Sequence, residues 1–247
     1  MSPLLSVEHL SIAFIQYDRG TSRRILPAIR DLDLTIDRGQ VAAVVGSSGS
    51  GKSLLAHGIL GILPYNAHME GTITYDGAPL TPKRAAALRG REIVLVPQSV
   101  GYLDPLMKVG PQVGRDKTAV RAVLDRYGLG PETEGLYPFQ LSGGMARRVL
   151  ISTAVAASPA LVIADEPTPG LDVRAAGRIL GHFRELADAG AGVLLITHDL
   201  ELALTIADKV AVFYAGETVE EAPAGDFDRL EDLRHPYTRA LWQALPQ

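Results

Sequence analysis

Hydrophobic residues along the chain form short, continuous runs that alternate with segments of helical spacing. The runs predict buried strands at residues 41–45, 92–96, 161–164 and 193–197. Between them, apolar residues at helical spacing predict helices at residues 52–63 and 173–188. Continuous apolar runs of this length are typical of parallel strands that are covered on both faces. The pattern therefore predicts an α/β fold with a mainly parallel sheet.

Two regions depart from this alternation. Residues 5–14 and 32–36 have the alternating pattern of half-buried strands, and a polar, glycine-containing segment around residues 17–24 joins them. This predicts a small antiparallel sheet near the N-terminus. Residues 99–140 are helical in pattern and rich in proline, glycine and charge. We expect them to form a helical insertion between two strands of the main sheet.

Composition and charge narrow the class of protein. With 247 residues, 47% hydrophobic and 21% charged, the chain has enough apolar material for a real core, which excludes general disorder. A net charge of −4 without a long basic run argues against dedicated nucleic-acid binding. The absence of cysteine excludes disulfides, thiolate zinc sites and cysteine-ligated iron–sulfur clusters. No run approaches the roughly 20 apolar residues of a membrane span, and the N-terminus lacks an export-signal pattern. We therefore expect a cytoplasmic protein that reaches membranes only by docking.

The strongest chemical signal lies between the first buried strand and the first helix. It matches the phosphate-binding pattern GxxxxGK[ST] with Gly46, Ser47, Ser48, Gly49, Ser50, Gly51, Lys52 and Ser53. Glycines let successive N–H groups point inward, and the helix N-terminus adds positive potential for phosphate. Lys52 would reach the β- and γ-phosphates, and the Ser53 hydroxyl would ligate Mg²⁺. The competing interpretation, a flexible Gly/Ser turn, does not explain the strand–loop–helix context, so we expect a nucleoside triphosphate site.

Two further segments suit the same chemistry. The strand at residues 161–164 ends in Asp165 and Glu166, which could serve as a magnesium-associated acid and as a base for water. Solvated acids at a strand end are the simpler alternative. The segment LSGGM places Ser142 before Gly143 and Gly144 at the start of an apolar helical run. A serine cap followed by two glycines would suit an anion, although a bare helix cap explains it equally well locally.

Together these motifs resemble the ATPase subunit of ATP-binding cassette (ABC) transporters over nearly the full length of the chain. The resemblance adds Gln98 in VPQS as the Q-loop glutamine, His198 in ITHD as the switch histidine, and GLD at residues 170–172 as the D-loop. It implies a P-loop NTPase (RecA-like) core at 41–98 and 151–235, an antiparallel β-subdomain at 1–40, a helical subdomain at 99–150 and a short C-terminal helix at 236–247. Phe14 falls where the family places an aromatic that stacks on adenine. Tyr17 is a second candidate, and simple packing explains either residue.

The resemblance also implies a mechanism shared between two chains. Two ATPase subunits would sandwich two ATP molecules, with Ser142, Gly143 and Gly144 touching ATP on the partner. Glu166 would be the base and His198 would hold the γ-phosphate. Gln98 would bind Mg²⁺ with Ser53 and report to the membrane subunits, while Asp165 acts through water.

Several short sequence segments indicate one group of transporters within the family. The segments YPFQ at residues 137–140 and HPYTRAL at residues 235–241 are similar to sequences of the oligopeptide, dipeptide and nickel importers. The sequence around LSGGM is most similar to that of the nickel-type ATPases. Two features depart from that group. The segment between Gln98 and Ser142 is short, and Arg147 stands where the family often has glutamine. These departures leave the coupling partner, and hence the solute, open among nickel, a metal chelate and a small peptide.

The implied partners are two transmembrane permeases, a second ATPase that is related but distinct, and indirectly an extracytoplasmic solute-binding protein, with no nucleic acid. The expected location is the cytoplasmic face of the inner membrane. An export ATPase would share every ATP-site residue, and only the HPYT and YPFQ segments argue against it. A non-transport ABC protein would be expected to carry a coiled-coil insertion or a second cassette. A small-molecule kinase would leave LSGGM, Gln98 and His198 unexplained.

Overall fold

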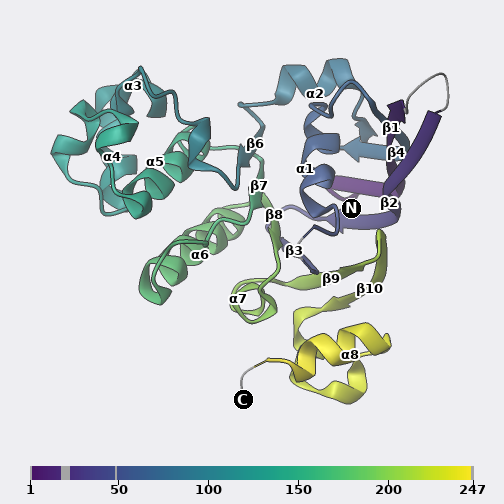
Figure 1. Cartoon of the computed structure of the whole chain (residues 1–247). Helices are drawn as coiled ribbons and strands as arrows, with labels where there is room; N and C mark the ends of the chain where they lie inside the picture. The colour runs from purple at the N-terminus through teal and green to yellow at the C-terminus, as the bar shows by residue number, and fades with distance from the viewer. Residues whose placement is uncertain (1, 18–22, 48, 246–247) are drawn as a thin grey trace.

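The computed structural model describes residues 2–17, 23–47 and 49–245, which form one mixed ten-stranded sheet with a helical arm at one side (Figure 1). In spatial order the strands are β5 (Ala78–Pro79), β4 (Ala67–Tyr75), β1 (Leu5–Tyr17), β2 (Arg23–Ile36), β10 (Glu217–Pro223), β9 (Lys209–Tyr214), β3 (Val41–Val45), β8 (Gly192–Thr197), β7 (Leu161–Asp165) and β6 (Ile93–Val96). The strands from β9 to β6 are all parallel. The predicted α/β class with a mainly parallel core is confirmed.

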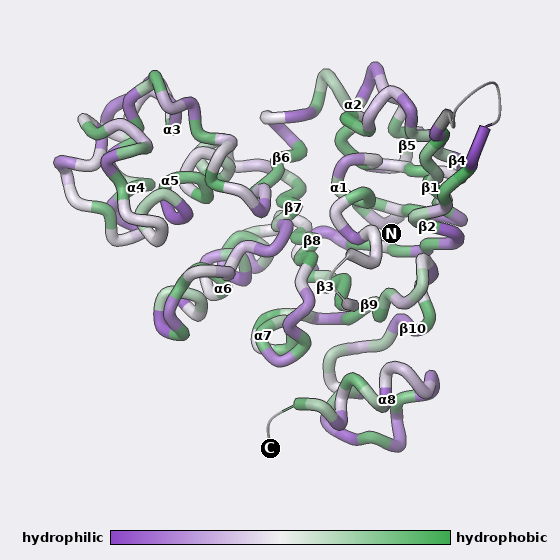
Figure 2. The backbone as a smooth tube through the Cα atoms, viewed as in Figure 1, coloured by the Kyte–Doolittle hydropathy of each residue, from purple (hydrophilic) through white to green (hydrophobic). Residues whose placement is uncertain are grey.

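The parallel strands are buried on both faces, as their continuous apolar runs predict. Val41 and Val45 of β3 lie in one hydrophobic cluster with Phe183, which belongs to α6 (Val173–Asp188). Val44 lies in the other cluster with Leu55, which belongs to α1 (Lys52–Leu60). Successive side chains of a strand point to opposite faces, so β3 contributes to both cores. Figure 2 shows the green, hydrophobic residues concentrated along these central strands.

The antiparallel part of the sheet is larger than the sequence predicts. β1 pairs with β2, as expected, but it also pairs with β4, and β4 pairs with β5. β4 and β5 fall within residues 41–98, which we assigned to the nucleotide-binding core, so the antiparallel region extends beyond residues 1–40. β4 gave no strand signal because most of its residues are exposed and it lacks a regular apolar alternation. The predicted linker overlaps residues 18–22, which lie outside the described residues.

The helical arm occupies the region predicted as an insertion between β6 and β7. Its elements are η1 (Val100–Tyr102), α3 (Val109–Val113), α4 (Lys117–Arg126), η2 (Pro131–Gly135), η3 (Pro138–Gln140) and α5 (Gly143–Val155). The remaining helical elements are α2 (Pro82–Leu88), α7 (Leu200–Leu204), η4 (Ala224–Asp228), η5 (Leu230–Asp232) and α8 (Pro236–Gln243). In the described ranges, no helix combines the length and apolar character that crossing a bilayer requires.

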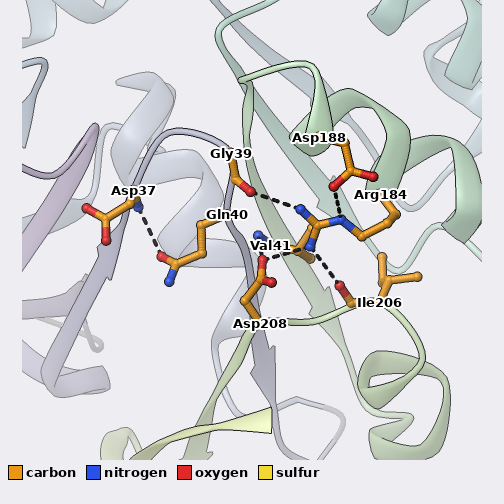
Figure 3. A network of polar contacts seen from close by, with 8 residues as sticks. All are labelled: Asp37, Gly39, Gln40, Val41, Arg184, Asp188, Ile206 and Asp208. Atoms are coloured by element: carbon orange, nitrogen blue, oxygen red, sulfur yellow. Dashed lines mark hydrogen bonds and ion pairs between the residues drawn. The ribbon is translucent and has the colours of Figure 1, made fainter.

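A polar network fixes the edge of the sheet where β3 begins (Figure 3). The Arg184 guanidinium of α6 donates to the Gly39 carbonyl at 2.9 Å and to Asp208 Oδ2 at 2.7 Å. The same Asp208 oxygen accepts from the Val41 backbone N–H at 2.7 Å. Arg184 also pairs with Asp188 at 2.9 Å, which holds its side chain along the helix. These contacts hold the amino end of β3 against α6. They therefore help to fix the position of β3, whose carboxyl end leads into the loop before α1.

The C-terminal segment is anchored to β10. Glu220 accepts hydrogen bonds from the backbone N–H groups of Arg234 at 2.7 Å and His235 at 2.9 Å. Trp242 of α8 donates from Nε1 to the Phe227 carbonyl at 2.5 Å. The expected C-terminal helix is present as α8, and residues 246–247 of the expected range lie outside the described residues.

Candidate nucleotide site

The predicted phosphate loop connects β3 to α1, and its glycines are needed for two different reasons. A Cβ at Gly46 would lie 2.1 Å from the Phe213 carbonyl oxygen, so only glycine fits against β9. Gly51 has φ +99°, and its Cβ would lie 2.9 Å from the Ala28 carbonyl oxygen of β2. A left-handed conformation is readily adopted by glycine alone. Ser48, also predicted in this loop, lies outside the described residues.

Lys52, which we predict to reach the β- and γ-phosphates, lies inside the loop. It is only 5% exposed, and its ammonium donates to the carbonyls of Gly46 at 2.7 Å and Ser47 at 2.8 Å. Burial lowers the pKa of Lys52, while the carboxylates of Glu166 and Asp165 oppose that shift. The result is a desolvated cation at the start of α1, where the helix dipole adds positive potential.

Asp165 ends β7 and offers a ready oxygen for a hard cation. Its Oδ1 is buried without a hydrogen-bond partner among the described residues. Burial raises the pKa of Asp165, and a side-chain hydrogen bond from Ser53 opposes the shift. Because a buried polar atom without a partner is costly, this oxygen is suited to a group that binds from outside the chain. A carboxylate, a hydroxyl and the amide oxygen of Gln98 form the oxygen donor set that Mg²⁺ prefers.

Glu166 is held at both its backbone and its side chain. Its φ of 46° is left-handed, a conformation that costs a non-glycine residue about 1–2 kcal/mol. Its backbone N–H donates to the Ile196 carbonyl at 2.8 Å. Its carboxylate shares a hydrogen bond with His198 Nδ1 at 2.8 Å and accepts from the Thr197 hydroxyl at 3.3 Å. Thr197 was missed from the sequence, although its place at the end of β8, next to His198, was an available signal.

A cavity of about 240 Å³ brings part of the predicted loop together with Gln98 and the acids at the end of β7, while Gly46, Ser47 and Ser50 do not line it. The residues that line it are Gly49, Gly51, Lys52, Ser53, Leu54, Gln98, Asp165 and Glu166. The carboxyl ends of parallel strands meet at one edge of a sheet, and this edge is where open α/β sheets bind ligands. The cavity therefore joins phosphate-binding groups, a candidate cation site and a candidate base.

Other predicted residues lie outside this cavity. Ser142 caps α5 by accepting from the Met145 N–H at 3.3 Å, and nothing lies within 4 Å of a Cβ placed on Gly143. Neither of these residues nor Gly144 lines the cavity, and Phe14 in β1 does not line it either. His198 contacts Glu166 but faces outward, with its side chain 54% exposed against 9% for Glu166.

Comparisons with known proteins show which family the chain belongs to. A family profile described as "ABC transporter" matches residues 29–169. The oligopeptide transport ATP-binding protein OppD of Lactococcus lactis subsp. cremoris is 37% identical over 265 residues, which cover 98% of this chain and 76% of that protein. The dipeptide transport ATP-binding protein DppD of Bacillus subtilis is 35% identical, with 100% of this chain and 78% of that protein covered.

Solved structures show the same fold. A dimeric ATP-binding cassette in a post-hydrolysis state, bound to ADP and Pi, superposes with a TM-score of 0.77 at 25% identity, covering 89% of this chain and 98% of that one. The structure of an ATP-binding subunit of an ABC transporter gives a TM-score of 0.75 at 26% identity, covering 97% and 98%. The chain therefore belongs to the ABC transporter family, as an ATP-hydrolysing subunit.

Proposed function

We propose that this chain hydrolyses ATP with Glu166 as the base that activates water. Backbone N–H groups of residues 46–53 hold the phosphates, and the Lys52 ammonium neutralises the β- and γ-phosphates. A water oxygen attacks the γ-phosphorus while the bond from that phosphorus to the bridging oxygen breaks. Glu166 accepts a proton of the attacking water, and ADP and inorganic phosphate are released.

The contact between Glu166 and His198 is the observation that carries this assignment. The two side chains meet at 2.8 Å, with Glu166 lining the cavity beside Lys52 and His198 reaching toward the exterior. A base must be held in position before water and phosphate bind, and the contact with His198 holds the Glu166 carboxylate in this way. From the outward side of the pair, His198 would hold the γ-phosphate.

The donor set around Asp165 supports magnesium as the cofactor. Ser53 and Gln98 would hold the ion, and Asp165 would act on it through water. When bound, Mg²⁺ neutralises charge on the phosphates. Among the described residues the buried Oδ1 of Asp165 has no hydrogen-bond partner, and binding of the hydrated ion would give it one, which favours this proposal.

Phe14 is our candidate for contact with adenine. It lies in β1 opposite Leu26 of β2, two residues before Ala28, whose carbonyl oxygen approaches Gly51. Phe14 is partly exposed, so its ring has a face available for stacking. The second candidate, Tyr17, ends β1, and its side chain lies outside the described part of the chain.

We propose that Ser142, Gly143 and Gly144 act on ATP held by a second ATPase subunit, related to this chain but distinct from it. Two observations support a role outside this chain's own site: the three residues are away from the cavity, and Gly143 has open space around it. The other expected partners are two permeases and, indirectly, a solute-binding protein, which would place the chain at the cytoplasmic face of the inner membrane.

We propose uptake of a small peptide as the process that ATP hydrolysis drives. The names of the two relatives support a peptide as the transported solute, whereas the sequence around LSGGM supports nickel or a metal chelate. The HPYT segment at the start of α8, anchored on Glu220, favours import over export by its similarity to the peptide and nickel importers.

An uptake experiment in cells tests this function. Cells carrying the natural chain or Glu166→Gln would be given a labelled dipeptide or nickel, and the tagged chain would be co-purified from solubilised membranes. We expect the substitution to abolish dipeptide uptake, and two permeases with a second ATPase to be recovered. Loss of nickel uptake alone would reassign the solute. Unchanged uptake of both, with the chain recovered alone, would contradict the importer proposal.

A further inference from the structure

Arg147 is a buried cation that the proposed chemistry does not use. It lies in the second turn of α5 and is 4% exposed. It forms no ion pair with any residue that the structure describes. Burying a guanidinium is costly, so the contacts that compensate it indicate what it does.

Its hydrogen bonds go to two backbone carbonyls, one of Glu166 and one of the residue before Gln98, and the nearby carboxylates of Asp165 and Glu166 also favour its charge. One guanidinium nitrogen donates to the Pro97 carbonyl at 2.8 Å, and the other donates to the Glu166 carbonyl at 3.1 Å. Pro97 follows the end of β6 and immediately precedes Gln98. The planar guanidinium therefore connects the backbone just before Gln98 with the backbone carbonyl of Glu166.

The contact at Glu166 is needed because its backbone conformation is strained. With φ at 46°, the residue relies on its surroundings to keep it left-handed. Its N–H is held by the Ile196 carbonyl of β8, and its carbonyl is held by Arg147. These two bonds fix both peptide groups of Glu166, and hence the direction in which its carboxylate leaves the chain.

We propose that Arg147 is a positioning residue, which holds Glu166 and the chain entering Gln98 in the arrangement that hydrolysis requires. This inference rests on the proposed role of Glu166 as the base. Arg147 touches neither nucleotide nor water in this account, and it acts through the backbone. Because α5 also begins with Gly143 and Gly144, the same helix that presents those glycines carries the group that holds the base.

The test compares three substitutions in the full-length chain, assayed with its partner subunits. Arg147→Met keeps the length of the side chain but removes both donors. Arg147→Lys keeps the charge with a single head group, and Arg147→Gln supplies a shorter, neutral donor. We expect Arg147→Met to lower kcat about 10- to 100-fold, the loss seen when groups that orient metal ligands are removed, while KM and the affinity for a fluorescent ATP analogue change less than about twofold. The lysine and glutamine variants should be intermediate.

A matched control separates positioning from general packing. Arg121→Met removes another arginine of the helical arm, whose partners are Asp125, Glu134 and the Leu129 carbonyl, none of them next to Gln98 or Glu166. Its kcat should equal that of the natural chain. A kcat within twofold of natural for Arg147→Met, or an equal loss in the control, would overturn the proposal.

Two further comparisons keep the outcome unambiguous. If Arg147→Met does not fold, as thermal unfolding would reveal, the lysine and glutamine variants decide: natural kcat in both would overturn the inference. Glu166→Gln tests the underlying function separately. If Glu166→Gln retains turnover, the role of the base is wrong, whereas an inactive Glu166→Gln beside a fully active Arg147→Met contradicts only the positioning role.

Discussion

Two helices of this protein begin with glycines, and the glycines are there for different reasons. At the N-cap of α1, Gly51 has φ +99°, and a Cβ on it would lie 2.9 Å from the Ala28 carbonyl oxygen. At the start of α5, a Cβ on Gly143 would meet nothing within 4 Å. The packing of this chain requires the first glycine and does not require the second. If Gly143 is needed at all, the need comes from something that approaches the chain from outside.

The N-terminal caps of α1 and α5 differ as well. Gly51 begins α1 without a side-chain cap, so the first N–H groups of that helix receive no side-chain acceptor at this position. Ser142 caps α5 with its own hydroxyl. The start of α1 is shaped as an anion site by the chain itself. The start of α5 is a stable helix end with an open surface, which suits a contact made only on assembly.

The largest expected effect concerns Glu166, which follows β7 and lines the same cavity as Lys52 at the start of α1. Glu166→Gln should lower ATP hydrolysis at least about 100-fold, because a positioned base contributes about 10²–10⁴-fold. Binding of ATP should persist, because Lys52 and the loop are untouched. Phosphate release by the assembled transporter and binding of a fluorescent ATP analogue would be measured together. Near-normal turnover would remove Glu166 from its role.

Lys52→Ala should act on binding instead of turnover. The substitution removes the cation that neutralises the phosphates, and we expect ATP affinity to fall about 100-fold, which is the loss of about 2.7 kcal/mol of charge-assisted contact. Equilibrium titration of the purified chain measures this. An unchanged affinity would mean that the loop 46–53 does not hold the triphosphate.

Gly46→Ala should damage stability more than any glycine change in α5. The added methyl overlaps the Phe213 carbonyl oxygen, and overpacking of this kind costs about 1–3 kcal/mol or more of the free energy of unfolding. Thermal or urea unfolding of the purified chain measures the loss. A natural midpoint for this variant would show that the loop can move away from β9.

The smallest expected effect comes from a glycine within a helix. Gly181 of α6 has nothing within 4 Å of an added Cβ, so Gly181→Ala should stabilise the chain by about 0.5–1 kcal/mol through helix propensity. It should leave ATP hydrolysis unchanged, which makes it the matched control for changes at Gly143. A lower unfolding midpoint would indicate a neighbour that the packing does not reveal.

Much of the parallel sheet and of the loop before α1 could be predicted from the sequence, because local patterns determine them. The apolar run at 41–45 and the helix at 173–188 coincide with β3 and α6, and the loop between β3 and α1 follows from residue types at fixed spacing. The end of β7 could be predicted for the same reason.

The features that were missed depend on contacts between distant segments. β4 gave no signal because it is largely exposed, and its place follows from pairing with β1. Arg147 could be recognised as unusual, but its contacts with Pro97 and Glu166 bring together segments separated by 50 and 19 positions. Only the packing of α5 against β6 and its hydrogen bond to the residue after β7 reveal them.

The most direct test of the difference between the two helix starts is the substitution Gly143→Asp. An acidic residue in the first turn of α5 agrees with the helix dipole, so the unfolding midpoint should be unchanged or slightly higher. ATP affinity of the purified chain should also be unchanged, since Gly143 is away from the cavity. Hydrolysis by the assembled transporter should fall at least about tenfold, because a carboxylate would then face phosphate across the subunit contact. Natural hydrolysis, or a loss of ATP affinity in the isolated chain, would contradict the account.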